Sequence, residues 1–202
     1  STVILIGVLT KLEDKFLITQ FFADSPREEP ELLARFLDFI EAFDVIFNYN
    51  GTAFDIPFLN QRILKAGLAP TIPLCKSFDL YRIVRSSFLS EALPNLKLKT
   101  VEKLAGIHRE DQISGKESVL LYKKYVSTKD KALARKILLH NYEDLTCFTS
   151  FANLLRKIDF HQAIQKHGFP IRTKKCVCYV SSINAGKGQI EASGTVLPAG
   201  MD

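Results

Sequence analysis

The sequence has few cysteines and no long apolar run, and these two absences exclude several classes of protein. Its 202 residues include four cysteines, too few and too irregularly spaced for the disulfide framework of a small secreted domain. The longest uninterrupted apolar run covers residues 3–9, far short of the roughly 20 residues that a membrane-spanning helix needs. No basic segment or small-residue cleavage site precedes this run, as a secretory signal would require. These features predict a soluble cytoplasmic protein with reduced thiols.

The chain also lacks internal repeats and low-complexity segments, which excludes repeat architectures and a disordered polypeptide. Hydrophobic residues make up 47% of the sequence and charged residues 24%, enough apolar material for a sizeable core. At roughly 100 to 200 residues per domain, the length predicts one full domain with a small appendage. Lys and Arg outnumber Asp and Glu by 27 to 22, and this net charge of +5 favours a polyanionic partner without demanding one.

Strand-like and helix-like segments alternate along the chain, a pattern that predicts an α/β fold. Apolar residues 3–9 and 16–22 flank a polar turn and predict an antiparallel hairpin, and the Ser-x-x-Glu pattern at residues 25–28 predicts a capping box. The same patterns predict a strand at 44–48, helices at 54–65, 78–88, 96–106, 117–126 and 131–157, and a C-terminal β-hairpin at 176–180 and 189–196. We therefore expect a mixed β-sheet flanked by helices in residues 1–168, followed by a hairpin extension in residues 169–202.

Two titratable residues interrupt the apolar face of the longest predicted helix. His140 and Asp144 are four residues apart, which places their side chains on one face about one turn from each other. The other members of this face are apolar: Leu133, Ile137, Phe148, Phe151 and Leu155. A carboxylate there must be paired, hydrogen-bonded or bound to a metal, because burying it alone costs several kcal/mol or raises its pKa. Alternatively, the pair closes one end of the core, or this edge of the helix is solvated.

A second acidic residue follows the strand predicted at residues 44–48. Asp55 lies where a strand ends in a glycine-containing loop and a helix begins, the edge at which open α/β sheets bind their ligands. The alternative is that Asp55, two residues before Pro57, is an ordinary helix N-cap. For Asp79, hydrogen bonding near a site and helix capping are equally compatible with the sequence.

These two segments together resemble the DEDD group of 3′–5′ exonucleases, which have the ribonuclease H-like fold. Residues 50–59, Asn-x-x-x-Phe-Asp-x-Pro-Phe-Leu, resemble the second motif of that group, and residues 140–144, His-Asn-Tyr-Glu-Asp, resemble its third motif. From residue 3 to about residue 155 the chain is similar to the bacterial YprB-like ribonuclease H-like domain. The segments that carry this similarity include residues 5–7, 78–80 and 93–102.

The resemblance implies a nuclease that hydrolyses phosphodiester bonds at single-stranded ends of DNA or RNA with two divalent ions. Hard oxygen ligands suit Mg²⁺ or Mn²⁺, and such ions clamp the attacking and leaving oxygens of the phosphodiester. By this resemblance, Asp55 and Asp144 would be metal ligands. His140 would orient or deprotonate the attacking water. Asn50 and Phe54 would line the substrate strand, although we interpret Phe54 in the first place as a core residue.

Two lysines in the segment 93–102 are candidates for contacts with the substrate backbone. Lys97 and Lys99 alternate with leucines and would bind phosphates, adding salt-sensitive affinity. The alternative is a solvated face with no ligand.

The first motif of the DEDD group, an Asp-x-Glu pair on the first strand, is absent from the sequence. Two divalent ions about 4 Å apart repel by roughly 17 kcal/mol at an effective dielectric constant of 20, and Asp55 and Asp144 leave that charge undercompensated. One explanation, which we favour, is a native polypeptide that extends upstream of Ser1, since a strand starts almost at once and no initiator Met is present. Otherwise the domain binds nucleic acid or protein without catalysis, or the similarity is limited to the fold.

Overall fold

The computed structural model describes residues 2–87, 89–104, 106–107, 113–155, 169–186 and 188–198. The chain divides into two compact units, each described by itself below: residues 1–36 with 102–154 form the first, and residues 37–101 with 155–202 form the second. The domain boundary expected between residues 168 and 169 stays a prediction. None of the helices in the described ranges is long and apolar enough to cross a membrane.

The first unit opens with the predicted antiparallel hairpin. Strand β1 (Leu5–Leu12) pairs with β2 (Lys15–Phe22), with Leu5 opposite Phe22 and Leu12 opposite Lys15. The polar residues between the two apolar runs form the turn, as their composition predicts.

The helix after this hairpin begins differently from the prediction. A 3₁₀ turn, η1 (Pro26–Glu28), precedes α1 (Glu29–Glu41), and the Ser25 side chain does not cap it. The backbone N–H of Glu28 donates instead to the Ser25 carbonyl, because the tight turn brings these two groups within 3.1 Å. The Glu28 carboxylate accepts from the Asp24 N–H at 2.8 Å, so the predicted reciprocal capping box is wrong.

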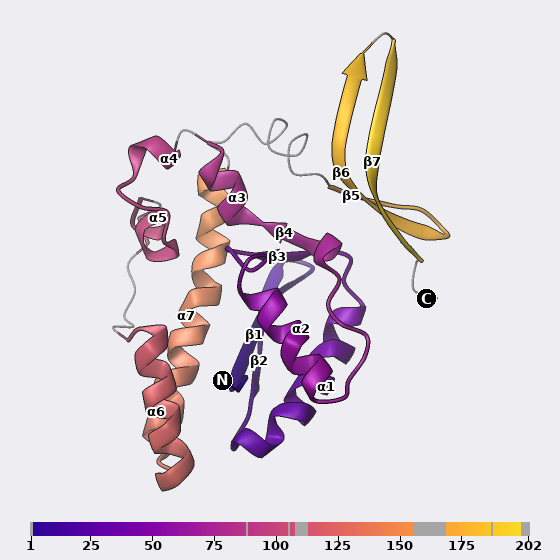
Figure 1. Ribbon diagram of the computed structural model, residues 1–202. Helices are drawn as coiled ribbons and strands as arrows, with labels where there is room; N and C mark the ends of the chain where they lie inside the picture. Colours follow the sequence, from indigo (N-terminus) through magenta and orange to yellow (C-terminus); the bar gives the residue numbers. More distant parts are fainter. Residues whose placement is uncertain are drawn as a thin grey trace. The chain divides into compact units, whose positions relative to one another are not determined.

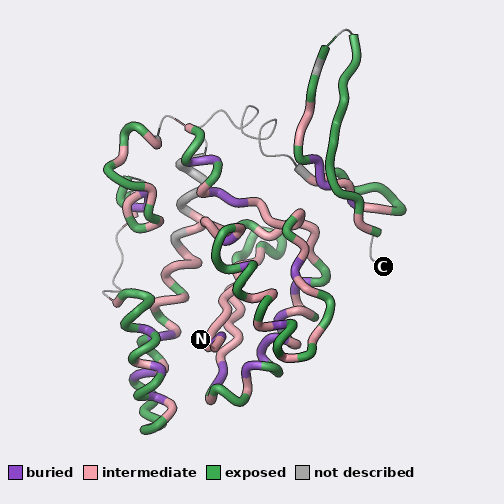
Figure 2. Tube along the Cα trace, viewed as in Figure 1, coloured by how far each residue is buried: buried purple, intermediate pink, exposed green. Residues whose placement is uncertain are grey.

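Two long helices complete the first unit. Helix α6 (Gly115–Thr128) starts at a capping box between Ser114 and Glu117, and α7 (Lys131–Leu155) follows after Lys129, which has the left-handed backbone conformation. The two helices lie side by side (Figure 1), and each contains buried residues (Figure 2) that belong to one apolar cluster. This buried cluster consists of Tyr122, Tyr125, Leu133 and Ile137, against which Ile4, Leu5 and Phe22 of the hairpin segment pack.

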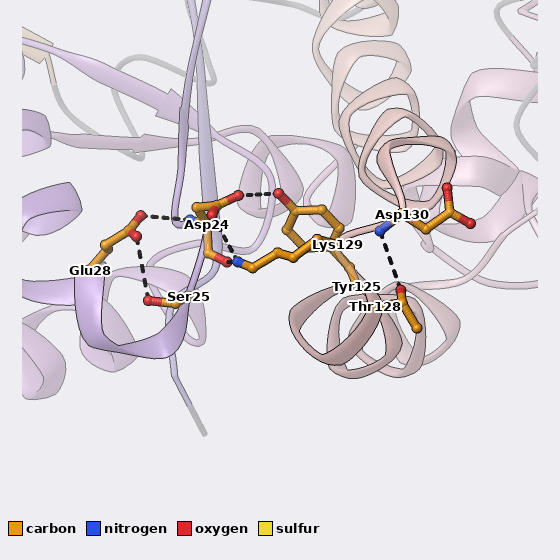
Figure 3. A network of polar contacts seen from close by, with 7 residues as sticks. All are labelled: Asp24, Ser25, Glu28, Tyr125, Thr128, Lys129 and Asp130. Atoms are coloured by element: carbon orange, nitrogen blue, oxygen red, sulfur yellow. Dashed lines mark hydrogen bonds and ion pairs between the residues drawn. The ribbon is translucent and has the colours of Figure 1, made fainter.

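A polar network ties the end of the hairpin to the end of α6 (Figure 3). The Tyr125 hydroxyl donates to the Asp24 carboxylate, and the Lys129 ammonium donates to the same carboxylate at 2.8 Å. Hydrogen bonds from Lys129 and Tyr125 hold the pKa of Asp24 below its ordinary value. Tyr122, one turn earlier, differs: its hydroxyl is buried and has no hydrogen-bond partner in the described part of the chain.

We expect the two tyrosines to respond in opposite directions to the same substitution. Tyr122→Phe removes an unsatisfied buried hydroxyl and should raise the free energy of unfolding by about 1 kcal/mol. Tyr125→Phe removes a hydrogen bond to an ionised carboxylate and should lower it by about 1 kcal/mol. Chemical denaturation measures both values, and equal destabilisation by the two variants would contradict the structural assignment.

The same phenols predict a loss of stability at alkaline pH. Burial raises the pKa of Tyr122 to about 12, and the hydrogen bond to Asp24 raises that of Tyr125 to about 12, from an ordinary value of 10.0. Because the folded-state values are higher, the stabilisation is complete below pH 10 and is lost as the pH rises towards about 12. Denaturation at a series of pH values should show this loss in the wild type and a smaller one in the Tyr122→Phe/Tyr125→Phe double variant.

The second unit contains a parallel strand pair, each strand followed by a helix. Strand β3 (Ile46–Asn48) pairs with β4 (Ser77–Asp79), with Asn48 opposite Asp79 at their carboxyl ends. Helix α2 (Asp55–Lys65) follows β3, and α3 (Leu80–Arg85) follows β4. The remaining elements of this segment are η2 (Leu74–Lys76), α4 (Leu89–Ala92) and α5 (Leu98–Leu104), the last of which reaches the unit boundary. Parallel and antiparallel pairs occur together, as a mixed α/β architecture requires.

A three-stranded antiparallel sheet ends the chain. Strands β5 (Phe169–Arg172), β6 (Cys176–Gly186) and β7 (Gln189–Pro198) pair in the order β5-β6-β7. The predicted hairpin is thus confirmed as β6 and β7, and β5 is an additional strand. This sheet is fixed to Asp44, two residues before β3. Arg172 donates to the Asp44 carboxylate at 2.6 and 2.5 Å, and the Tyr179 hydroxyl donates to the Asp44 carbonyl at 2.8 Å.

Candidate functional site

The loop between β3 and α2 is held by one buried carboxylate at the end of β4. Asp79 is 7% exposed, and its oxygens accept hydrogen bonds from the backbone N–H groups of Asn50 at 2.7 Å and Thr52 at 3.2 Å. The same carboxylate accepts from the N–H of Tyr81 at 3.1 Å and so caps α3. Asp79 is therefore confirmed as a helix cap, and it also binds the loop before α2; whether this loop belongs to a functional site stays a prediction.

Side chains of the two strands fix the loop further. Asn48 accepts from the Gly51 N–H at 2.9 Å and donates to the Ser77 hydroxyl at 2.7 Å, while the hydroxyls of Thr52 and Ser77 lie 2.8 Å apart. A Cβ atom on Gly51 would lie 2.7 Å from the Asn48 side-chain oxygen, so only glycine fits at this position. The loop conformation is consequently determined by the carboxyl ends of both parallel strands.

Asp55 emerges from this fixed loop as the first residue of α2. Phe54 is the N-cap residue and makes no side-chain cap, so the alternative prediction that Asp55 is the N-cap is wrong. Asp55 is exposed at the surface, but surrounding protein atoms displace part of its hydration and raise the pKa of its carboxyl. The nearby Asp79 carboxylate raises that pKa further by repulsion. Two neighbouring carboxylates thus lie at the end of β4 and the start of α2, one engaged by backbone N–H groups and one at the surface.

His140 and Asp144 lie together on α7, as their spacing predicts. The Nε2 atom of His140 is 3.8 Å from an oxygen of Asp144, and the two side chains are 13% and 38% exposed. The pair is therefore neither sealed in the core nor fully open to solvent. Of the apolar residues on this helix face, Leu133 and Ile137 are buried, Phe148 is half-buried, and the side chains of Phe151 and Leu155 lie outside the described part.

The β1–β2 hairpin fixes α7 beside this pair. Gln20 donates to the Leu138 carbonyl at 2.9 Å and to the Asn141 side-chain oxygen at 2.8 Å. Gly7 lies opposite Gln20 in the hairpin, and a Cβ atom there would come within 2.1 Å of that same Asn141 oxygen. The absence of a side chain at Gly7 is what allows the strand and the helix to approach so closely.

Phe54 differs from its interpretation as a core residue, which is wrong because 66% of its surface is exposed. It is the N-cap residue of α2, whose buried residues are Ile56 and Ile63. Its alternative role, lining a substrate strand, stays a prediction.

The other predicted substrate contacts, Asn50, Lys97 and Lys99, belong to the second unit, and both lysines are exposed. Asn50 and Lys97 line an open groove of about 410 Å³ together with Tyr49, Tyr81, Leu96 and Leu98. The rings of Tyr49 and Tyr81 meet edge to face with centroids 5.7 Å apart, and the Tyr49 hydroxyl donates to the Leu96 carbonyl at 2.6 Å. Sequence reasoning missed these two tyrosines, although each closely follows a strand end.

The predicted metal ligands belong to different units, with Asp55 in the second and Asp144 in the first. Their convergence on a shared cation stays a prediction. Within the described ranges, no cluster of three or more His, Cys, Asp or Glu side chains is arranged to hold a metal ion.

Taken together, these features define an α/β protein with a carboxylate at the carboxyl end of a parallel strand and a His/Asp pair on a long helix. A family model described as the RNase_H superfamily matches residues 1–173, so the chain belongs to the ribonuclease H superfamily. The chain is also 28% identical over 161 residues to "Uncharacterized protein YprB" of Bacillus subtilis (strain 168). That match covers 78% of this chain but only 38% of the Bacillus protein.

The family match confirms the predicted ribonuclease H-like domain, whose scaffold is of the nuclease type. The Bacillus match confirms that the domain is related to YprB. Nucleases with this fold generally use divalent metal ions, and the fold suggests nucleic-acid binding. No solved structure gave a significant match.

Proposed function

We propose that this domain is a metal-dependent 3′–5′ exonuclease that hydrolyses phosphodiester bonds at the ends of single-stranded nucleic acid. The observation that carries the proposal is the pair of neighbouring carboxylates formed by Asp79 at the end of β4 and Asp55 at the start of α2. The oxygens of Asp79 are engaged by three backbone N–H groups, whereas Asp55 is exposed at the start of α2, directly after the loop that Asp79 holds. Asp55 is therefore the carboxylate of this pair that can meet an external cation.

The donor atoms fit a hard divalent ion. Asp55 and Asp144 both offer carboxylate oxygens that reach solvent, and oxygen ligands of this kind suit Mg²⁺ or Mn²⁺. The carboxylates of Asp55 and Asp79 are both negative and repel each other. A bound cation would offset this repulsion. Such an ion, when bound, would polarise the phosphodiester and ease deprotonation of water.

His140 is proposed to orient the attacking water or to accept its proton. Imidazole is a common general base, and a neighbouring carboxylate can hold its ring in a defined orientation. An oxygen of Asp144 lies 3.8 Å from Nε2 of His140, close enough for this orienting role.

The substrate strand is proposed to follow the groove next to Asn50. Bases stack on aromatic rings with little dependence on sequence, and the groove is lined by the half-buried Tyr49 and Tyr81, which could serve this purpose. Lys97 and Lys99 would contact phosphates, and Phe54, exposed beside Asp55, would contact the terminal nucleotide.

The test is digestion of end-labelled single-stranded DNA and RNA by the full-length protein. We expect shortening from the 3′ end with Mg²⁺ or Mn²⁺, none with EDTA, and none on a substrate whose 3′ hydroxyl is blocked. Salt-sensitive binding without cleavage would instead support a noncatalytic nucleic-acid-binding module. Absence of both binding and cleavage would support a protein-interaction role for the scaffold.

A further inference from the structure

Two cysteines at the start of β6 point their thiols to the same side of the strand. Cys176 and Cys178 are two residues apart, and alternation along a strand places such side chains on one face. Their sulfur atoms lie 3.9 Å apart, and both thiols are free and half-buried. The alternating residues Val177 and Tyr179 are 3% and 6% exposed, so they occupy the buried face.

The thiol face of the sheet is partly open and apolar. Cys178 lies opposite Ile171 of β5 and Val196 of β7, and directly opposed residues in antiparallel strands share a face. Ile171 is 45% exposed and Val196 is 62% exposed. An ion arriving from solvent can therefore reach the two sulfur atoms without any rearrangement of the buried face.

The separation of the sulfur atoms matches a metal chelate better than a disulfide. A tetrahedral ion with metal–sulfur bonds of about 2.3 Å needs its two sulfurs about 3.8 Å apart. A disulfide needs about 2.05 Å between sulfurs and a Cα separation of at most about 6.8 Å. Residues i and i+2 of a strand are about 6.6 to 6.8 Å apart, at the upper end of this Cα range, so the backbone of β6 leaves little room for a disulfide to close.

We propose that Cys176 and Cys178 form a two-thiolate binding site for a thiophilic divalent metal ion of the Zn²⁺ type. This site is separate from the proposed nuclease centre in chemistry, because soft sulfur ligands select Zn²⁺ or Cd²⁺ whereas carboxylates suit Mg²⁺ or Mn²⁺. The Thr173 hydroxyl lies 3.3 Å from the sulfur of Cys176 and borders the site. Since the described residues supply no third His, Cys, Asp or Glu ligand, water or an external donor completes the coordination.

The experiment is a titration of the reduced full-length protein with Cd²⁺, followed by the ultraviolet charge-transfer absorbance of thiolate–cadmium bonds. We expect an absorbance increase with binding of one ion per site. Cys176→Ser and Cys178→Ser should each weaken binding by about 100-fold or more, since loss of a direct ligand exceeds the roughly 10- to 100-fold effect of losing an outer-shell partner. The matched control is Cys75→Ser, a half-buried thiol of η2, which should leave the affinity unchanged.

A second measurement does not depend on the folding of variants. In the wild-type protein, bound Cd²⁺ should protect two thiols from alkylation, and mass spectrometry should identify them as Cys176 and Cys178. Protection of other cysteines, or unchanged affinity in both single variants, would overturn the proposal. The Asp55→Asn variant should bind Cd²⁺ at this thiol site as the wild type does. Cadmium binding can therefore be tested even if the proposed nuclease function is wrong.

Discussion

Asparagine in place of Asp55 is expected to lower the rate of phosphodiester hydrolysis by about 10³-fold or more while the domain stays folded. The amide has the size of the carboxylate but lacks the negative charge that would hold a divalent ion, and about 4 kcal/mol of transition-state stabilisation corresponds to that factor. The rate is measured by single-turnover digestion of a labelled oligonucleotide at saturating Mg²⁺ or Mn²⁺. Unchanged turnover in Asp55→Asn would contradict the assignment of Asp55 as a ligand.

Stability distinguishes a functional role of Asp55 from a structural one. Partial loss of hydration and the neighbouring Asp79 carboxylate raise the pKa of the surface residue Asp55, so the fold disfavours its ionised form. Because the pKa of Asp55 is higher in the folded state, ionisation of this carboxyl lowers the free energy of unfolding as the pH rises through that pKa. The neutral side chain of asparagine cannot ionise and so avoids this loss of stability. Asp55→Asn should therefore unfold at the same or a slightly higher denaturant concentration at pH 7. The control Asp38→Asn, on an exposed position of α1, should change neither stability nor hydrolysis.

The double variant tests whether Asp55 and Asp144 converge on one cation. Asp144→Asn alone should reduce hydrolysis as strongly as Asp55→Asn, because each would remove one ligand of the same ion. If they act as a unit, the double variant should lose little more activity than either single variant. Multiplicative losses would show that the two carboxylates act independently and would contradict a shared metal centre.

The elements that the sequence predicts correctly are those with local signals. The hairpin of β1 and β2, most of the helices and the pairing of β6 with β7 each follow from apolar periodicity and turn residues within a short window. The helix predicted at residues 78–88 is wrong in its bounds, because residues 77–79 form strand β4 and α3 covers only Leu80–Arg85. Strand β5 has no such signal, because it is four residues long and contains Pro170. It is a strand because it pairs with β6, and its own sequence shows no strand pattern.

The site shows the same division between local and non-local information. Asp55 and the His140–Asp144 pair could be selected from strand–loop–helix order and helical spacing. The role of Asp79 could not, because two of its three backbone donors lie 27 and 29 residues earlier in the chain. The exposure of Phe54 was also missed, since an aromatic residue at a helix start gives no sign of which way it points. Tertiary contacts decide what these residues do.

Alanine in place of Asp79 is expected to lower the free energy of unfolding by about 3 kcal/mol. The substitution leaves three backbone N–H groups without their acceptor, those of Asn50, Thr52 and Tyr81, and each lost bond costs about 1 kcal/mol. Chemical denaturation measures this value. Asp130→Ala is the matched control, because that exposed aspartate accepts from the single N–H of Ala132 at the start of α7 and should cost only about 1 kcal/mol.

The same variant separates the support of the loop from the chemistry of its carboxylate. Without Asp79 the loop before Asp55 loses its anchor, so limited proteolysis should cut within residues 49–54, and hydrolysis should fall even though Asp55 is intact. Asp79→Asn keeps one acceptor oxygen but turns an amide NH₂ towards backbone donors, and it should therefore lie between the wild type and Asp79→Ala. If Asp79→Ala is no less stable than Asp130→Ala and resists proteolysis in the loop, then Asp79 does not hold the loop, and the fixed presentation of Asp55 needs another cause.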